Sequence, residues 1–95
     1  MTGRFVLAYD VPDDRRRAKL ARLLEGFGDR VQYSVFELIL RERELAELRR
    51  RIAALIDPDE DSVRLYFVCS SCFRKIEDLG RSVRPPFDAP EVLIF

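Results

Sequence analysis

The order of strand-like and helix-like patterns along the chain is the feature that most restricts its fold. Residues 5–9 and residues 63–68 are short runs rich in strand-forming apolar residues. Between them lie two stretches with apolar residues at helical spacing, and these are separated by a segment in which apolar and polar residues alternate. This order predicts an α+β domain in which strands and helices alternate along the chain.

A helix is expected directly after the first strand. Pro12 ends the strand, and Asp13 or Asp14 is expected to cap the helix. The helix is expected to end at Gly26-Phe27-Gly28. Its apolar positions are Leu20, Leu23, Leu24 and Phe27. The pattern therefore predicts a helix with one apolar side.

The alternation that follows slips by one residue at Val35-Phe36. Before the slip the apolar residues lie at the odd positions, Val31, Tyr33 and Val35. After it they lie at the even positions, Phe36, Leu38 and Leu40. A one-residue slip reverses the inward face of a strand. The segment is therefore either one long bulged strand or two strands that meet at a sharp bend without the usual turn residues.

A charged helix is expected from Glu42 to Ile56, with Glu47 and Arg51 as an exposed pair one turn apart. Its buried stripe is expected to contain Leu45, Leu48, Ile52, Leu55 and Ile56. Pro58 ends it, and the strand at residues 63–68 leads into a short helical turn and loop at residues 69–80. Residues 81–90 are expected to be an extended connector.

These elements predict a ferredoxin-like βαββαβ sheet with both helices on one face, plus one added strand at the C-terminus. Residues 1–80 are expected to form the domain, and residues 81–95 an extended arm. The apolar residues of the arm are Val92, Leu93, Ile94 and Phe95. Because a chain of 95 residues buries a small core, we expect an oligomer, and we expect the apolar C-terminal strand to pair with an open sheet edge.

The absence of histidine restricts the chemistry. It excludes histidine general bases, Ser-His and Cys-His pairs, and most mixed zinc sites. Lys and Arg total 17 against 17 Asp and Glu, so nucleic-acid binding must come from local clusters. No apolar run approaches the roughly 18 residues of a membrane span, and no signal-peptide cleavage site is recognisable in residues 1–10. A cytoplasmic protein without membrane contact is expected.

Asp10, directly after the first strand, is the strongest candidate for a catalytic and metal-binding residue. A rigidly held carboxylate at the edge of a sheet suits Mg²⁺ or Mn²⁺, and Mg²⁺ usually keeps several waters and needs one or two protein carboxylates. One such residue per chain indicates a site that a dimer completes. The alternative is a turn-forming aspartate before Val-Pro, just as Asp13 and Asp14 are first of all helix caps.

A basic cluster occupies the first half of the first helix. Its members are Arg15, Arg16, Arg17, Lys19 and Arg22. Backbone N–H groups and the helix dipole also favour phosphate there, so the cluster is a candidate clamp on a nucleic-acid backbone. The alternative is a solvated helix face, which is also the preferred interpretation of Arg49–Arg51.

Cys69 and Cys72 have the C-x-x-C spacing, but two cysteines without histidine are too few ligands for structural zinc in one chain. We interpret them as a reduced pair at a strand-to-helix junction, with a four-cysteine zinc site across a dimer as the alternative. Ser34 has no base nearby in sequence, so we interpret it as a small strand residue and not as a nucleophile.

Three stretches of the chain resemble the second core CRISPR-associated protein family, the small partner of the CRISPR integrase in spacer acquisition. They are residues 5–11 (FVLAYDV), 13–17 (DDRRR) and 30–37 (RVQYSVFE), the last being the most specific. Length and the apolar C-terminal strand agree, so that the resemblance covers nearly the whole chain.

The resemblance implies a ferredoxin-like homodimer with exchanged C-terminal strands, an adaptor that bridges two integrase dimers with duplex DNA across its basic surface. It also implies Mg²⁺-dependent cleavage of RNA, or of double-stranded DNA in some members, with Asp10 as metal ligand. Two hypotheses follow: a structural DNA-binding subunit, and a metal-dependent phosphodiesterase with paired Asp10 residues. A ferredoxin-like toxin-type ribonuclease is a third alternative.

Overall fold

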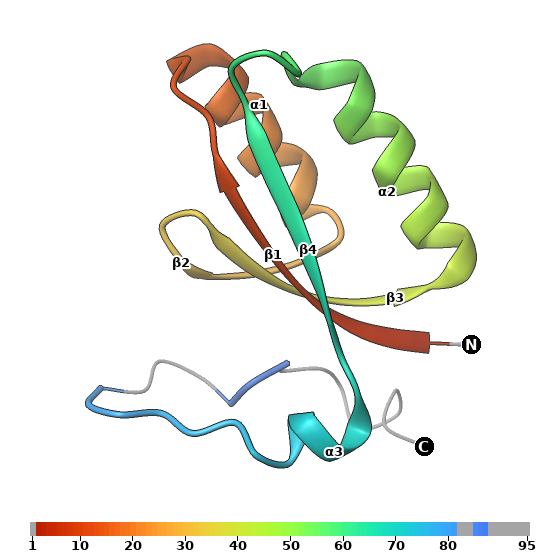
Figure 1. Ribbon diagram of the computed structural model, residues 1–95, viewed down its shortest axis with the longest axis vertical. Coiled ribbons are helices and arrows are strands. Elements are labelled where there is room, and N and C mark those ends of the chain that lie inside the picture. Colours follow the sequence, from red (N-terminus) through yellow and green to blue (C-terminus); the bar gives the residue numbers. More distant parts are fainter. Residues whose placement is uncertain (1, 82–84, 88–95) are drawn as a thin grey trace.

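The computed structural model describes residues 2–81 and 85–87. They form a four-stranded antiparallel sheet of order β2-β3-β1-β4, with α1 and α2 on one face (Figure 1). The elements are β1 (Thr2–Asp10), α1 (Asp14–Glu25), β2 (Gly28–Gln32), β3 (Val35–Arg41), α2 (Glu42–Leu55), β4 (Ser62–Val68) and α3 (Ser70–Phe73). The expected ferredoxin-like arrangement is confirmed, while the expected C-terminal strand at residues 92–95 lies outside the described residues.

Helix α1 begins and ends as expected. The carboxylate of Asp13 caps it by accepting a hydrogen bond of 2.8 Å from the Arg16 N–H, which also holds the pKa of Asp13 below its usual value. Gly26 is the C-cap, and its N–H donates to the Leu23 carbonyl while the Phe27 N–H donates to the Leu24 carbonyl.

Strands β2 and β3 form a hairpin whose two-residue turn is Tyr33-Ser34. The slipped alternation therefore reflects two strands, with Gln32 opposite Val35 and a register shift between Arg30 and Gln32. Ser34 lies in the turn and not in a strand, which corrects its assignment. Its carbonyl accepts a hydrogen bond of 3.1 Å from the Tyr9 N–H, so the turn is fastened to the end of β1.

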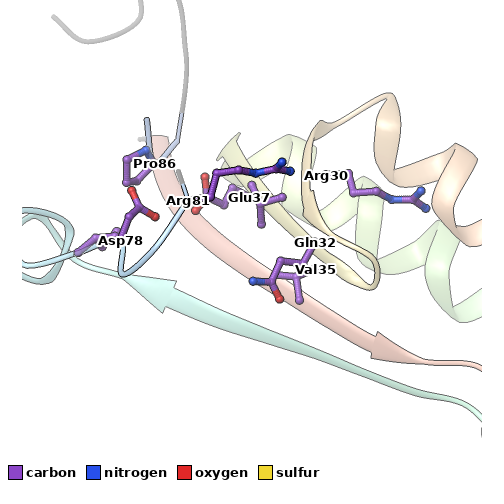
Figure 2. A pocket seen from close by; sticks show the side chains of 9 residues that line it. Arg30, Gln32, Val35, Glu37, Asp78, Arg81 and Pro86 are labelled. Carbon is purple, nitrogen blue, oxygen red and sulfur yellow. The ribbon is translucent and has the colours of Figure 1, made fainter. Parts of the chain in front are cut away.

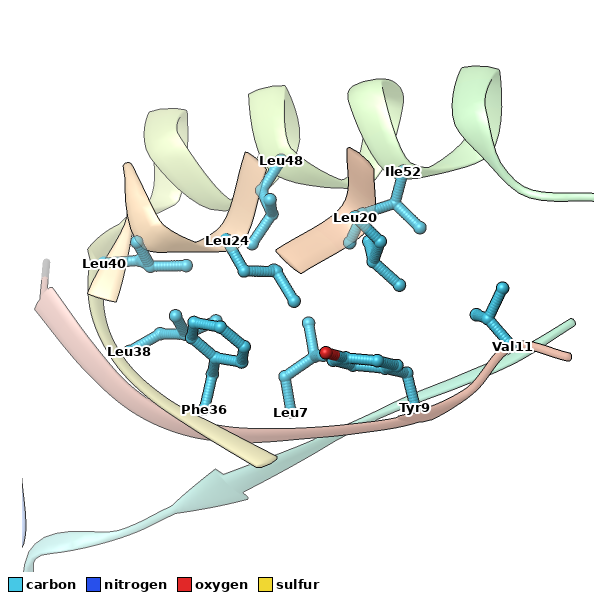
Figure 3. Packing of buried hydrophobic residues seen from close by; sticks show 10 residues of the cluster. All are labelled: Leu7, Tyr9, Val11, Leu20, Leu24, Phe36, Leu38, Leu40, Leu48 and Ile52. Carbon is cyan, nitrogen blue, oxygen red and sulfur yellow. The ribbon is translucent and has the colours of Figure 1, made fainter. Parts of the chain in front are cut away.

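The hydrophobic core lies between the sheet and the two long helices (Figure 3). Its residues are Leu7, Tyr9, Val11, Leu20, Leu24, Phe36, Leu38, Leu40, Leu48 and Ile52. On α2 only Leu48 and Ile52 of the expected stripe are buried, and the other three pack partly buried against the core. Since residues 36, 38 and 40 face the core, the alternate residues of β3 point to the opposite face of the sheet.

We call that opposite face, which α1 and α2 leave uncovered, the open face; α3 and the described residues after it, 74–81 and 85–87, lie on its side of the sheet (Figure 1). The Arg4 guanidinium of β1 lies 4.1 Å from the centre of the Phe73 ring, and Phe73 meets Phe87 edge to face at 6.0 Å. The Phe87 N–H donates a hydrogen bond of 2.6 Å to Glu37 Oε1 of β3. Residues 74–81 and 85–87, the connector, are thus fastened to the sheet.

At Phe87 the connector departs from the extended form expected for residues 81–90. This residue is buried and has a φ of 52°, within a turn at residues 86–87. Burial of the aromatic ring and the bond to the Glu37 carboxylate favour a turned backbone over a straight one. Within residues 2–81 and 85–87, no helix has the length and apolar character needed to cross a membrane.

Candidate active site at the end of the first strand

Asp10 is the last residue of β1, opposite Ser62 of β4, and its side chain is exposed. Leu7 and Tyr9 face the core, so the alternation of the strand directs Asp10 to the open face. The backbone next to it is fixed on both sides, because β1 pairs with β4 up to Asp10 and with β3 up to Ala8, and the Tyr9 N–H is bound to the turn. The carboxylate is therefore exposed on a rigid support.

A solvent-open hollow of about 570 Å³ surrounds Asp10. Its lining residues are Tyr9, Asp10, Val11, Pro12, Arg17, Tyr33 and Ser34. The Tyr9 hydroxyl donates to the Tyr33 carbonyl at 3.4 Å, while the Tyr33 side chain itself is 71% exposed. The hollow thus places a carboxylate, a guanidinium and an exposed aromatic ring around one opening.

Arg17 secures the loop between β1 and α1. Its Nη1 donates to the carbonyls of Val11 at 2.9 Å and Pro12 at 3.3 Å, and its Nη2 forms an ion pair with Asp14. The hydrogen bond to Asp14 raises the pKa of Arg17. These bonds fix the backbone directly after Asp10 and leave Arg17 partly neutralised by its neighbour.

The donor set at Asp10 fits a water-rich Mg²⁺ or Mn²⁺ ion in part. An exposed carboxylate is a hard oxygen ligand of the kind these ions prefer. Among the described residues, however, no group of three or more His, Cys, Asp or Glu side chains is placed to hold a metal. One chain therefore supplies one of the one or two carboxylates that Mg²⁺ usually takes from a protein.

The expected basic cluster divides into two sets in the structure. Arg16 and Arg17 are engaged within the chain, Arg16 with Asp61 and Arg17 with Asp14. The side chains exposed on the outer face of α1, with no ion pair to any described residue, are Arg15, Lys19 and Arg22. We call these three the α1 basic face. On α2, by contrast, Glu47 binds Arg50 at 2.6 Å and Arg51 at 2.8 Å.

A second hollow, of about 360 Å³, lies where the connector approaches the hairpin (Figure 2). The hairpin lines it with Arg30, Val31, Gln32, Val35 and Glu37, and the connector with Ile76, Asp78, Arg81 and Pro86. It carries both signs of charge, in keeping with a contact between two segments of the same chain. The Asp10 hollow has a different set of lining residues.

Of the residues around this hollow, the sequence patterns single out Asp10 and Arg17 but not the two tyrosines. Tyr9 fits only an apolar strand in those patterns, and Tyr33 only an alternating segment. The slip in alternation at Val35-Phe36 is the one local signal for these residues. It indicates a turn just before Val35, and the structure places that turn beside the end of β1. The ion pair that engages Arg16 had no local signal, because Asp61 is 45 residues away.

Comparisons with known proteins agree with this geometry. The family model described as "CRISPR associated protein Cas2" matches residues 3–76. A Synechocystis protein named CRISPR-associated endoribonuclease Cas2 3 is 44% identical over 86 residues, which cover 90% of this chain and 90% of that one. A Thermus thermophilus protein named CRISPR-associated endonuclease Cas2 2 is 46% identical over 89 residues, or 94% of each chain.

The chain is also similar to one chain in the solved structure of a complex. A chain in a partial Cas6-RT-Cas1–Cas2 complex superposes with a TM-score of 0.78 at 30% identity, and the match covers 93% of this chain and 94% of that one. Fold and family model together define a small ferredoxin-like CRISPR-associated protein. The chain belongs to the Cas2 family.

Proposed function

We propose that this protein is a homodimeric subunit of CRISPR spacer acquisition that bridges integrase dimers and holds duplex DNA, with a metal-dependent endonuclease site at Asp10. The observation that carries the proposal is the near-full-length likeness to a chain of a complex that is named for both Cas1 and Cas2. The matching family and both of the relatives named above are CRISPR-associated. This favours a CRISPR protein over the alternative of a toxin-type ribonuclease.

The edge of the sheet supports the homodimer. Among the described residues β4 pairs only with β1, and its Tyr66 and Phe67 side chains are 49% and 67% exposed. An unpaired apolar edge strand is a template for another strand. The arm at residues 81–95 carries the apolar segment 92–95, and we propose that it pairs with the edge of the partner's sheet.

The α1 basic face supports duplex binding. Arg15, Lys19 and Arg22 are exposed on one side of α1, where they reach phosphate without first breaking an ion pair to another described residue. Three cations on a net-neutral chain favour contacts to the nucleic-acid backbone over base readout. The protein therefore binds DNA with little sequence preference.

The endonuclease chemistry rests on Asp10. Two chains related by a two-fold axis near the ends of their β1 strands would bring two Asp10 carboxylates together, and like charges held close favour a bound cation. Asp10 would hold a Mg²⁺ or Mn²⁺ ion, which would supply an activated water and charge stabilisation at the phosphate. The bonds of Arg17 to the Val11 and Pro12 carbonyls keep the loop after Asp10 in place.

The experiment compares Asp10→Asn with the unaltered chain in two assays, nuclease activity on RNA and duplex DNA, and spacer acquisition beside its integrase. Asp10→Asn keeps the side-chain shape and removes the charge. We expect cleavage to fall by at least about 100-fold, because the lost charge stabilisation is worth several kcal/mol. Acquisition is expected to persist, as an adaptor needs no hydrolysis.

Asp59→Asn is the matched control, because it makes the same change at an exposed aspartate in the turn after α2. Full cleavage by Asp10→Asn would remove the catalytic assignment and indicate a contaminating nuclease. Loss of acquisition together with cleavage would make the nuclease the primary function.

A further inference from the structure

The Cys69-Ser-Ser-Cys72 segment joins β4 to the connector and has no part in the function proposed above. Cys69 is the residue directly after β4 and the N-cap of α3, and Cys72 is in the first turn of α3. Both are free thiols with exposed side chains. Within the described part of the chain, no other cysteine, and no group of side chains suited to a metal, accompanies them.

Backbone hydrogen bonds hold the two cysteines next to each other. The Cys72 N–H donates a hydrogen bond of 3.4 Å to Cys69 Sγ, and the Phe73 N–H donates one of 2.8 Å to the Cys69 carbonyl. The capping geometry therefore brings the Cys69 sulfur over the turn that begins at Ser70. Cys72 is three residues further on in the same turn, and its backbone N–H contacts the Cys69 sulfur, so the two cysteines are neighbours at the start of α3.

The same contacts make the two thiols chemically unequal. Two hydrogen bonds lower the pKa of Cys69: the larger effect comes from the Cys72 N–H and the smaller from the Cys72 thiol. The bond to Cys69 raises the pKa of Cys72. Cys69 is thus the more readily ionised of the two, which suits a dithiol in which one cysteine attacks first and the other resolves.

We propose that Cys69 and Cys72 form a redox-active dithiol that closes reversibly to an intramolecular disulfide with a low-molecular-weight disulfide as oxidant. In the first step the Cys69 thiolate attacks one sulfur of the external disulfide, forms a mixed disulfide and releases one thiolate. In the second step Cys72 loses its proton to solvent and its sulfur attacks Cys69 Sγ. The second external thiolate leaves, so two protein thiols are oxidised and one external disulfide is reduced to two thiols.

Glutathione disulfide is the probe for the full-length protein, reduced beforehand and freed of reductant. Intact-mass spectrometry after acid quenching is expected to show the loss of two hydrogen atoms in a monomeric chain, reversed by excess reduced glutathione. Cys72→Ser is expected to stop at an adduct of one glutathione on Cys69. This variant keeps the backbone N–H that contacts Cys69 Sγ, and because both side chains are exposed the fold is expected to persist.

The two single variants separate a reactive pair from two ordinary surface thiols. At neutral pH we expect the thiol left in Cys72→Ser to react at least about tenfold faster than the thiol left in Cys69→Ser, because reactivity follows the thiolate fraction. Equal rates would overturn the proposal. So would a wild-type product that carries two glutathiones, a disulfide between two chains, or stoichiometric zinc on the purified protein that protects both thiols.

Discussion

Arg16 and Asp61 are joined by two hydrogen bonds, from Nε to Oδ2 at 2.7 Å and from Nη2 to Oδ1 at 3.1 Å. The pair ties the first turn of α1 to the residue before β4, and the Asp61 side chain is fully covered. Asp61 also accepts a bond of 2.8 Å from the Asp57 N–H. A bidentate pair with a backbone contact locks the loop after α2 against α1.

Asp61→Asn is expected to lower the thermal unfolding midpoint at neutral pH. The Arg16 bond holds the pKa of Asp61 below its ordinary value of 3.8, so the carboxylate adds stability above that value. This stability is lost as the pH falls through the lowered pKa of the folded state. The difference from wild type should therefore be full at about pH 7 and shrink toward about pH 3, as measured by circular dichroism. Asp59→Asn, in the same loop, should match wild type throughout.

Replacement of the α1 basic face by alanine is expected to flatten the salt dependence of duplex binding. For each phosphate that Arg15, Lys19 or Arg22 no longer neutralises, the slope of log K against log[salt] should fall by about 0.9. The control replaces Arg49, Arg50 and Arg51, which removes the same charge from α2. Fluorescence anisotropy over a series of salt concentrations measures the slope for both variants. A smaller slope in the α2 control alone would assign the DNA-binding surface to α2.

Chelation of divalent metal is expected to abolish cleavage and leave duplex binding unchanged. Asp10 supplies a metal ligand in the proposal, whereas the α1 basic face contacts phosphate without a metal. Cleavage should return when Mg²⁺ or Mn²⁺ is added back to the wild type but not to Asp10→Asn. Duplex binding that disappears with the chelator would contradict this separation of the two surfaces.

Truncation after Pro90 is expected to shift the protein from dimers to monomers or aggregates. The removed residues include the apolar strand 92–95, which would otherwise pair with the partner's sheet and cover its edge. Size-exclusion chromatography with light scattering at micromolar concentration measures the change. A truncated chain that stays a compact dimer would assign the dimer contact to other residues.

Gly28→Ala is expected to destabilise the fold, while Gly26→Ala is not. A Cβ at Gly28 would lie 2.3 Å from the Glu37 carbonyl oxygen of the paired strand, so backbone has to move, at a cost of about 1–3 kcal/mol. At Gly26 the nearest atom is the Leu23 carbonyl oxygen at 3.3 Å, and we expect a change within about 0.5 kcal/mol. Urea denaturation gives both values, and equal stabilities would contradict the close strand approach at Gly28.

Local patterns were sufficient to predict most of the fold. The Asp13 cap and the Gly26 C-cap depend on residues within one turn of the helix, and both were predicted. The hairpin was harder, because Tyr33-Ser34 contains neither Gly nor Asn, and only the slip in alternation indicated it. Contacts between distant segments were beyond any local pattern.

The candidate site shows the same division. Asp10 was found because it directly follows an apolar strand, a feature of neighbouring residues. The pairing of Arg16 with Asp61 joins residues 45 positions apart, and the bond from Phe87 to Glu37 spans 50. Such pairs depend on which segments become neighbours in the fold, and local sequence patterns carry no information on that. Local patterns therefore place Arg16 among the phosphate ligands and Phe87 in an extended chain, and neither expectation includes the distant partner.

The bond from the Phe87 N–H to Glu37 gives the open face an occupant from its own chain. A tethered segment acts as an internal competitor, because its local concentration near the face is high at any dilution. Any partner that covers the same surface would bind with its intrinsic affinity scaled by the fraction of chains in which the segment has moved aside. A change that weakens the Glu37 contact would therefore raise the affinity of such a partner.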